Sequence, residues 1–417
     1  MAKKTINKEL TGAQDLYNFL FEACNIIRGP VSQDNFKDYI TPLLYYKRIS
    51  DVYDEETEEA LISSGGDKEY ASLPEQHRFV IPDGCHWQEV RERTENLGAA
   101  IVGAMRQIEI ANPDTLYGVL SMFSSQKWTN KAILNDSKIR DLIEHLSKRK
   151  LGNKDYPADL MGDAYEILLK KFADDSKAQA GEFYTPRSVV RLLVHILDPQ
   201  PGETVYDPAC GSGGMLIEAI RYMHDDSLCC GSIFGQEKNV VNAAIAKMNL
   251  FLHGASDFNV MQGDTLRDPK ILQGGNIAKF DCVIANPPFS LENWGATEWS
   301  SDKYKRNIYG TPSDSCGDYA WIQHMICSMS SGKGRMAVVM PQGILFRGNQ
   351  EAEIRKQLVE SDLIEAVVTL GDKLFYGTGL SPCFLIIRRM KQAHHSGRIL
   401  MIDGSKILTQ KRAQNIL

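Results

Sequence analysis

The stretch that most constrains this chain is the run FDCVIANPPF at residues 280–289. Its apolar part, Cys282 to Ala285, has the composition of a buried strand, and the two prolines that follow prevent the strand from continuing. A stiff turn is therefore predicted at the carboxyl end of this strand, made of Asn286, Pro287, Pro288 and Phe289. Open α/β sheets bind their ligands at that edge, so we expect this turn to carry the chemistry.

The groups in this turn suit a planar ring that carries an amino group. If the Asn286 side-chain oxygen and the Pro287 carbonyl both accept from one NH₂, its nitrogen lone pair leaves conjugation and becomes nucleophilic toward an activated methyl group. Phe289 would stack on the ring, a contact worth about 1–3 kcal/mol per base. An Asn-Pro dipeptide alone is ordinary turn chemistry, but its place directly after an apolar strand favours a functional site.

Length and hydropathy limit the number of domains and the class of protein. A chain of 417 residues exceeds one ordinary hydrophobic core, so we expect two domains, residues 1–150 and residues 151–417. No run approaches the roughly 18 apolar residues of a membrane span. The polar start MAKKTINKEL also lacks the apolar core of a signal peptide. We therefore expect a cytoplasmic protein that does not engage a membrane.

The cysteines and the net charge argue against two kinds of site. The nine cysteines are scattered without any C-x-x-C spacing, which favours reduced thiols over a zinc site or a disulfide framework. No metal is expected. The net charge of −6 argues against a protein that wraps DNA by itself, because non-specific affinity comes from neutralised phosphates. A nucleic-acid substrate would require a basic partner or a local basic patch.

Residues 1–150 are predicted to form a helical bundle. Apolar residues recur at helical spacing near the N-terminus, and a second helix follows, which Pro42 should kink or divide. Further helices are predicted at about residues 87–108 and 137–148. Nothing in this part has catalytic spacing.

Residues 151–417 change to strands that alternate with helices, the pattern of a doubly wound α/β sheet. Thr185 is predicted to cap a helix that has Pro186 at its first position. Residues 290–315 read as a long polar loop, a length typical of a functional flap or of disorder. Two final strands, predicted between residues 381 and 402, could pair as an antiparallel hairpin.

A glycine-rich loop follows the first predicted strand of this part, in the run ETVYDPACGSGGM. Asp207 comes at the strand end, and Gly211, Gly213 and Gly214 let the backbone approach a ligand closely. Such a loop alone would serve NAD, FAD or S-adenosylmethionine. A carboxylate at this point would repel a phosphate but attract an ammonium group, so Asp207 favours S-adenosylmethionine over a dinucleotide.

Two more acidic residues follow the next predicted strands. Glu237 could accept from ribose hydroxyls or cap the helix that follows it. Asp264 could accept from an adenine amino group or simply cap the next turn. Because the carboxyl ends of parallel strands share one edge, we expect both residues to converge with Asp207 and Asn286, and four weak signals that agree make a strong one.

The combination of GEFYTPR, DPACGSGGM, GQE, QGD and NPPF resembles the amino-group DNA methyltransferases in which the cofactor motif precedes the catalytic one. With its helical N-terminal part, the chain is similar to the modification (M) subunit of type I restriction-modification systems. The resemblance implies an S-adenosylmethionine-dependent methyltransferase sheet, and methylation of adenine N6 with the target base flipped out of the duplex. It places the following residues in the site: Glu182, Phe183, Tyr184, Thr185, Pro186 and Arg187 at the methionine end, Asp207, Gly211, Ser212 and Gly213 around it, Glu237 at the ribose, Asp264 at the adenine, and Asn286, Pro287, Pro288 and Phe289 in catalysis.

The resemblance also implies partners. A specificity (S) subunit recognises the sequence in double-stranded DNA, two M subunits join each S subunit, and a restriction (R) subunit is added for cleavage. The acidic net charge and the short stretch after the last predicted strand agree with a chain that leaves recognition to a partner. Members of the family usually continue through a helical C-terminal tail, which this sequence does not show before Leu417, so we expect an incomplete docking surface for the specificity subunit.

Three other interpretations stay open from the sequence. A protein glutamine N-methyltransferase could use the same Asn-Pro-Pro geometry on an amide nitrogen, although size and the helical N-terminal part count against it. A non-catalytic scaffold subunit is disfavoured by the intact turn and the intact acidic series. An NAD-linked oxidoreductase is disfavoured by Asp207.

Overall fold

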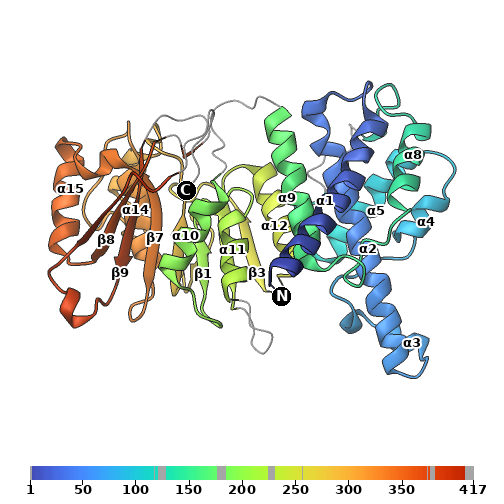
Figure 1. Ribbon diagram of the computed structural model, residues 1–417, viewed down its shortest axis with the longest axis horizontal. Helices are drawn as coiled ribbons and strands as arrows, with labels where there is room; N and C mark the ends of the chain where they lie inside the picture. Colours follow the sequence, from blue (N-terminus) through green and yellow to red (C-terminus); the bar gives the residue numbers. More distant parts are fainter. Residues whose placement is uncertain are drawn as a thin grey trace. The chain divides into compact units, whose positions relative to one another are not determined.

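The computed structural model describes residues 2–116, 118–120, 128–175, 185–223, 231–255, 257–372, 374–375 and 381–408 (Figure 1). The chain divides into two compact units. The first consists of Met1–Ala178 with Lys247–Gly254, and the second of Gln179–Ala246 with Ala255–Leu417. Within the described ranges, every helix is too short or too polar to span a lipid bilayer.

The first unit is helical in its described part. Its elements are α1 (Ala2–Ile27), η1 (Gln33–Asn35), α2 (Lys37–Ser63), α3 (Lys68–Ala71), η2 (Pro74–Gln76), α4 (Trp87–Glu92), α5 (Leu97–Ala111), α6 (Pro113–Leu116), α8 (Asp136–Leu146) and α9 (Ala158–Asp175). Helix α9 belongs to this unit, whereas the sequence set the domain boundary at residue 150. Helix α12 (Val240–Leu252) adds its last residues here as well, where Phe251 packs edge-on against Tyr45 and Phe79.

Of the two effects predicted for Pro42, a kink or a division of the helix, the division is wrong, and so is the single helix predicted over residues 87–108. Pro42 does not divide its helix, because α2 continues to Ser63 with a buried run from Tyr39 to Val52 that outweighs one missing backbone hydrogen bond. The helix predicted over residues 87–108 is two helices, α4 and α5. The break lies at Asn96, which takes a left-handed backbone conformation with φ 53° and donates its N–H to the Asp136 carboxylate at 3.1 Å.

The second unit is built on an eight-stranded sheet in the order β10-β8-β9-β7-β6-β1-β2-β3. Its strands are β1 (Val205–Asp207), β2 (Ile233–Glu237), β3 (Phe258–Gln262), β6 (Cys282–Ala285), β7 (Arg335–Pro341), β8 (Ile364–Leu370), β9 (Pro382–Arg388) and β10 (Leu400–Gly404), with β4 (Leu272–Gln273) and β5 (Asn276–Ile277) in a separate pair. Its helices are α10 (Arg187–Leu197), α11 (Gly214–Met223), the first part of α12, α13 (Ala296–Ser300), α14 (Asp318–Ser328), η3 (Gln342–Leu345), α15 (Asn349–Glu360) and η4 (Ala393–His395). Only β9 runs antiparallel to its neighbours among these described strands of the large sheet, which confirms the predicted doubly wound α/β sheet.

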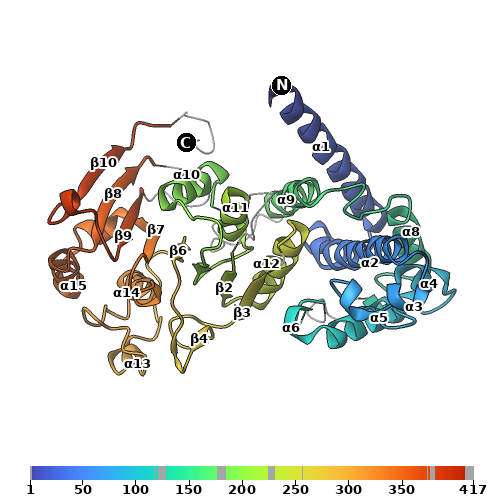
Figure 2. The ribbon, with the colours of Figure 1, turned by 90° about the horizontal axis from the view of Figure 1, so that it is seen from below.

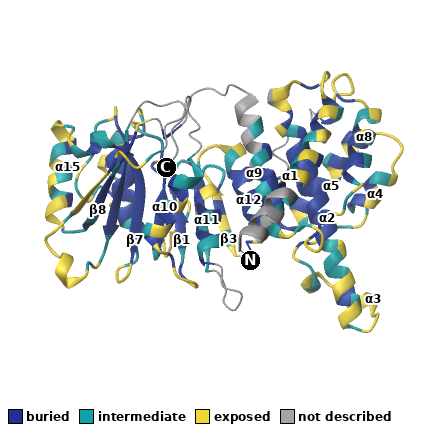
Figure 3. Ribbon diagram, viewed as in Figure 1, coloured by how far each residue is buried: buried dark blue, intermediate teal, exposed yellow. Residues whose placement is uncertain are grey.

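The order of the strands marks one place on the sheet for a ligand. Helices α10 and α11 pack on one face and α14 on the other (Figure 2), and β6 and β7 between them are buried along their whole length (Figure 3). From β1 the chain steps outward to β2 and β3, and it then returns to the opposite side of β1 as β6. Ligands of open α/β sheets bind outside the carboxyl ends of the strands at such a switch point, here between β1 and β6.

The last two strands do not form the hairpin that the sequence allowed. Strand β9 lies between β7 and β8 and pairs with both of them, so neither of its edges is left for another strand. Strand β10 therefore pairs with β8 instead, in parallel, and forms the outer edge of the sheet.

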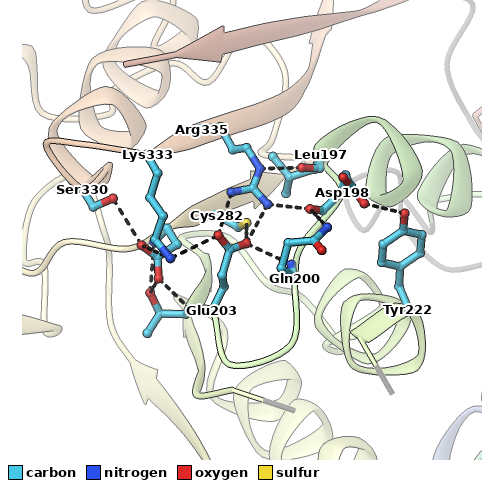
Figure 4. A network of polar contacts seen from close by, with 11 residues as sticks. Leu197, Asp198, Gln200, Glu203, Tyr222, Cys282, Ser330, Lys333 and Arg335 are labelled. Atoms are coloured by element: carbon cyan, nitrogen blue, oxygen red, sulfur yellow. Dashed lines mark hydrogen bonds and ion pairs between the residues drawn. The ribbon is translucent and has the colours of Figure 1, made fainter. Parts of the chain in front are cut away.

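A buried ion-pair network closes the amino edge of the sheet (Figure 4). Arg335, the first residue of β7, donates to both carboxylate oxygens of Glu203, at 3.1 and 2.6 Å, and each of these residues is only 6% exposed. The same guanidinium donates to the carbonyls of Leu197 and Asp198 at the end of α10, at 2.6 and 2.5 Å. Helix ends leave such carbonyls without intrahelical partners, so one arginine joins α10 to the starts of β1 and β7.

Candidate active site

Polar side chains from neighbouring strands meet at the carboxyl edge of this sheet. Asp207 and Glu237 are the last residues of β1 and β2, Asp264 follows β3, and Asn286 follows β6 directly. Strands β6, β1, β2 and β3 are consecutive in the sheet and parallel to one another. The structure therefore brings the four predicted residues to one edge, on both sides of the switch point.

In the side-chain amide of Asn286, the nitrogen makes a hydrogen bond and the oxygen has no partner among the described residues. Its side-chain nitrogen donates to the Thr185 hydroxyl at 2.8 Å. Its side-chain oxygen is buried, and among the described residues it has no hydrogen-bond partner. A buried acceptor without a donor costs about 1–3 kcal/mol, so this site retains an unfavourable group that a ligand N–H would satisfy.

Thr185 does not cap a helix, as the sequence predicted. Helix α10 begins at Arg187 with Pro186 at the N-cap position, one residue later than expected, and no side chain caps it. The hydroxyl of Thr185 is engaged by Asn286 instead, because the tertiary contact takes the group that a local cap would have used. The residues Glu182, Phe183 and Tyr184, predicted for the methionine end of the cofactor, lie outside the described residues.

The rest of the turn after β6 is partly or fully buried. Pro287 is buried, Pro288 and Phe289 are half-buried, and the Phe289 ring lies 6.2 Å from the ring of Phe375 at an angle of 64°. Ser290 then takes a left-handed conformation with φ 49°. Such a conformation is uncommon for a residue with a side chain, and it persists here because the turn is fixed on both sides.

The group that fixes the far side of this turn is Asp318, which sequence analysis missed. Asp318 is the first residue of α14, is fully buried, and accepts the backbone N–H of Ser290 at 2.7 Å. Its other oxygen pairs with Arg347, which also donates to Glu351 at 2.6 Å. An acidic residue in the first turn of a helix is common for reasons of the helix dipole alone, so the sequence held no signal that singled it out.

Asp207 is buried at the switch point without a cation beside it among the described residues. Burial raises the pKa of its carboxyl to about 8, against a smaller opposing effect of the Ala209 N–H, which donates to it at 2.9 Å, and with a further rise from the nearby charge of Glu237. A positively charged ligand group would favour the ionised carboxylate. Asp207 is thus suited to an ammonium group, as its place in the sequence predicted.

The glycines of the loop after β1 have different roles. Gly211 has φ 53°, and among the described residues no neighbouring atom lies within 4 Å of where its Cβ would be, so its backbone is open to a ligand. Gly213 has φ 84°, and a Cβ at this position would lie 3.4 Å from the Cβ of Ala246 in α12. Gly211 therefore leaves the loop open to a ligand, and Gly213 supplies the left-handed backbone conformation that a side chain would disfavour, with Ser212 between them.

Glu237 and Asp264 both make the capping contacts that were the alternative to ligand binding. The Glu237 carboxylate accepts the backbone N–H of Gly211 at 2.9 Å and that of Asn239 at 2.7 Å, which links the glycine loop to the start of α12. One oxygen of Asp264 accepts two N–H groups of its own turn, at 3.2 Å each, and the other pairs with Lys238 at 2.9 Å. The Asp264 oxygen that pairs with Lys238 is the one with a second lone pair for a ligand donor.

The segment of residues 290–315 is ordered, and the alternative of disorder is wrong. Trp294 and Trp299 are each 2% exposed, and the short helix α13 lies between residues 296 and 300. Polar composition predicted a solvated loop, but the two indoles supply a core that the segment folds around.

Arg306 anchors this segment beneath the turn that carries Asp264. Its side chain is 2% exposed, and its guanidinium donates to both oxygens of Asp302 and to the backbone carbonyls of Thr265 and Leu266, at 2.8–3.0 Å. Buried arginine in a fixed fork of acceptors is a rigid element. The sequence offered no way to find it, because its partners after β3 lie about 40 residues away.

The site fits S-adenosylmethionine by three observations. Asp207 is a buried carboxylate that a cation would stabilise, Gly211 presents open backbone beside it, and Asn286 presents an unpartnered acceptor across the switch point. The sheet and this set of groups at its carboxyl edge are those of an S-adenosylmethionine-dependent methyltransferase that acts on an amino nitrogen.

Comparison with known proteins gives the family. The family described as N-6 DNA Methylase matches residues 156–417, and the family described as HsdM N-terminal domain matches residues 16–146. The chain therefore belongs to the N-6 DNA methylases, adenine-specific DNA methyltransferases whose methyl donor is S-adenosylmethionine, and within them to the methylase subunits of type I restriction enzymes. This confirms the fold class, the family resemblance and the cofactor predicted from the sequence.

Individual relatives agree. The MjaVIII methylase subunit of Methanocaldococcus jannaschii is 33% identical over 95% of this chain and 69% of its own length. The MjaVII methylase subunit of the same organism is 34% identical over 87% of this chain and 63% of its own length. The crystal structure of a type I restriction-modification methyltransferase subunit from Streptococcus thermophilus superposes with a TM-score of 0.79 at 26% identity, over 97% of this chain and 90% of that one. The chain thus spans about two thirds of the curated relatives it matches.

Proposed function

We propose that this chain is the modification subunit of a type I restriction-modification complex and transfers a methyl group from S-adenosylmethionine to N6 of an adenine flipped out of duplex DNA. The observation that carries the proposal is the buried, unpartnered side-chain oxygen of Asn286 at the switch point of the sheet. An exocyclic amino group is the donor that such an acceptor lacks. Family membership supports the same reaction.

The cofactor would be held along the ends of β1, β2 and β3. We assign Asp207 to its ammonium group, Glu237 to the ribose hydroxyls, and Asp264 to the adenine amino group, which requires the exposed side chain of Lys238 to move aside. The remaining residues assigned to this site are Glu182, Phe183, Tyr184, Thr185, Pro186 and Arg187 at the methionine end, and Gly211, Ser212 and Gly213 around it. When bound, S-adenosylmethionine supplies an electrophilic methyl group.

The turn after β6 would act on the target base. The Asn286 oxygen and the Pro287 carbonyl accept the two amino hydrogens, which keeps the nitrogen lone pair out of conjugation and directed at the methyl group. Thr185 holds the Asn286 amide in the orientation this requires, because it engages the nitrogen and leaves the oxygen open. Pro288 stiffens the turn, and Phe289, supported by Phe375, stacks on the base.

We further propose that the chain acts as part of an assembly. In this view residues 151–417 form the catalytic domain and residues 1–150 the N-terminal helical domain, in line with the two matched families. The net charge of −6 leaves sequence recognition to a specificity subunit, which would join two copies of this chain, and a restriction subunit would be added for cleavage. Its substrate being genomic DNA, the protein would work in the cytoplasm.

Transfer of labelled methyl from S-adenosylmethionine tests the proposal. Duplex DNA should be labelled by the chain together with its specificity subunit, and the label should be recovered as N6-methyladenine. The chain alone should bind DNA weakly and without sequence preference at physiological salt. Label that enters glutamine side chains of a protein acceptor instead of DNA would overturn the proposal, and so would the absence of transfer to either.

A further inference from the structure

An exposed aromatic side chain lies at the same edge of the sheet as the candidate active site. Phe346 follows the short helix η3 at the carboxyl end of β7, and it is 74% exposed, the highest value for any large apolar side chain among the described residues. Strand β7 is the parallel neighbour of β6, with Ala285 paired to Val338. Their carboxyl ends therefore share one edge, and the loops that carry Phe289 and Phe346 leave the sheet side by side.

The loop around Phe346 is held rigidly. The carbonyl of Ile344 accepts from the Tyr319 hydroxyl at 2.7 Å and from Arg355 at 3.2 Å, and the same arginine donates to the Arg347 carbonyl at 2.9 Å. The side-chain amide of Gln342 donates to two carbonyls of the neighbouring strand ends at 3.3 Å each. Exposure of Phe346 is thus a property of a fixed turn and is not the result of a loose one.

One buried carboxylate joins this turn to the catalytic one. Asp318 accepts the N–H of Ser290, the residue after Phe289, and pairs with Arg347, the residue after Phe346. The two aromatic residues therefore sit on turns that share an anchor, and their separation is set by the fold.

We propose that Phe346 is a second aromatic contact to DNA, which stacks on a base that loses its neighbour when the target adenine leaves the duplex. The inference rests on the proposed function. Displacing a base costs stacking and pairing energy, and a rigid aromatic ring can replace part of the lost stacking, an effect of about fivefold to 150-fold per base.

The surroundings of Phe346 favour a base over a protein surface as its partner. The residues that follow it, from Arg347 to Gln350, are three polar residues and a glycine, all half or fully exposed, and the apolar residue before it, Leu345, is half-buried, so the chain beside Phe346 adds no other fully exposed apolar side chain. Protein interfaces bury aromatic residues within contiguous apolar patches, whereas a single exposed ring suits stacking on a base.

The test compares Phe346→Ala and Phe346→Trp with the wild type, each assembled with the specificity subunit. The probe is a duplex oligonucleotide that contains the methylated sequence, mapped beforehand by sequencing. Phe346→Ala should lower single-turnover methylation at subsaturating DNA about tenfold, Phe346→Trp should stay within about threefold of the wild type, and S-adenosylmethionine affinity should not change. Met390→Ala is the matched control. Met390 is 71% exposed but follows the antiparallel strand β9, at the opposite edge of the sheet, and its loss should have no effect.

A second duplex separates a DNA contact from a structural role. When the target adenine faces a mismatched base, displacement costs less, so the defect of Phe346→Ala should shrink to below about threefold. Equal rates for Phe346→Ala and the wild type on the matched duplex would overturn the inference alone. So would an unchanged defect on the mismatched duplex, or a defect that is traced by size-exclusion chromatography to poor assembly. No methylation by the wild-type complex would overturn the proposed function and this inference together.

Discussion

The carboxyl groups at the two ends of strand β1 have pKa values that are shifted in opposite directions. Glu203 precedes the strand and Asp207 ends it. Burial alone would raise the pKa of Glu203, but hydrogen bonds from Arg335 and from the Gln200 N–H outweigh it and hold that pKa at about 2. Burial of Asp207, opposed only by the Ala209 N–H, raises its pKa to about 8. At the amino end of β1, hydrogen bonds outweigh the cost of burying the Glu203 carboxylate. At the carboxyl end, the cost of burying the Asp207 carboxylate outweighs its one hydrogen bond.

The difference separates the groups that stabilise the fold from the groups that would bind a ligand. At the amino edge, charges and helix-end carbonyls are paired within the chain (Figure 4). At the carboxyl edge, the chain leaves Asn286 with an open acceptor and Asp207 without a cation among the described residues. Groups that are costly to bury and left incomplete mark the side of the sheet where something else completes them.

The largest effect is expected from breaking the amino edge. Arg335→Ala removes the buried cation from Glu203, which keeps only the exposed Lys333 as a charged partner, and removes one donor from each of two helix-end carbonyls. Removal of one partner from a buried pair costs about 3–5 kcal/mol of stability. Urea denaturation followed by circular dichroism should show that loss. Lys333→Ala is the control, because Lys333 also contacts Glu203 but its side chain is 65% exposed, and it should cost under about 1 kcal/mol. Equal losses in the two variants would contradict the comparison.

At the carboxyl edge, a substitution should lower the rate of methyl transfer and not the stability of the fold. Contacts of Asn286 to the amino group tighten in the transition state, so Asn286→Ala should lower single-turnover methylation by the assembled complex about 10²–10³-fold, as for other preorganised hydrogen-bonding groups. Affinity for S-adenosylmethionine should stay within a few-fold, and Thr185→Ser, which keeps the hydroxyl, should remain active. If Asn286→Ala kept more than about a tenth of the rate, the turn would not be catalytic.

Loss of Glu237 should weaken cofactor binding, both directly and through the glycine loop that its carboxylate holds. Loss of a charged hydrogen-bond partner costs about 1.5–3 kcal/mol, so Glu237→Ala should weaken S-adenosylmethionine binding roughly 10- to 100-fold by calorimetry. Glu353→Ala, an exposed glutamate on α15, is the control and should bind normally. Unchanged affinity in Glu237→Ala, and likewise in Asp207→Asn and Asp264→Ala, would refute the cofactor site.

The sharpest test is the pH dependence of stability without ligand. Asp207 binds its proton more tightly in the folded chain, so it lowers the free energy of unfolding as pH rises from about 4 to 8, by at most about 1.4 kcal/mol per pH unit. Glu203 has the opposite sign: its contribution is complete above about pH 4.5 and is lost as pH falls toward 2. Asp207→Asn should therefore remove the slope between pH 4 and 8 only. A slope that survives in Asp207→Asn would show that Asp207 is not its source.

The sequence predicted the carboxyl edge better than the amino edge. Strand β6 was bounded correctly because its apolar run stops at two prolines, and strand ends placed Asp207, Glu237 and Asn286 without knowledge of side-chain contacts. Arg335 is only a basic residue directly before the apolar run from Met336 to Met340. Its partners are about 130 residues away, and no local pattern reports such a contact.

Within the site, the sequence could not show which groups position the others. Thr185 carries a typical capping side chain, and only the fold reveals that the hydroxyl bonds Asn286, 101 residues away. Asp318 likewise occupies an ordinary helix start, 28 residues after the N–H it accepts. Sequence analysis did not single out Phe346, because a lone aromatic residue after an apolar run gives no sign of whether it is exposed.

Helix α12 has a consequence for how the protein is made. Its end packs in the core of the first unit, where Phe251 meets Tyr45 and Phe79, and where His253 lies so close to Gly162 that no side chain could stand at that position. During synthesis the N-terminal unit therefore cannot close its core until residue 254 has left the ribosome, when β1 and β2 have already emerged. Domains usually fold in the order in which they are translated, but here the nascent helical unit must wait for a segment that lies inside the methyltransferase sequence.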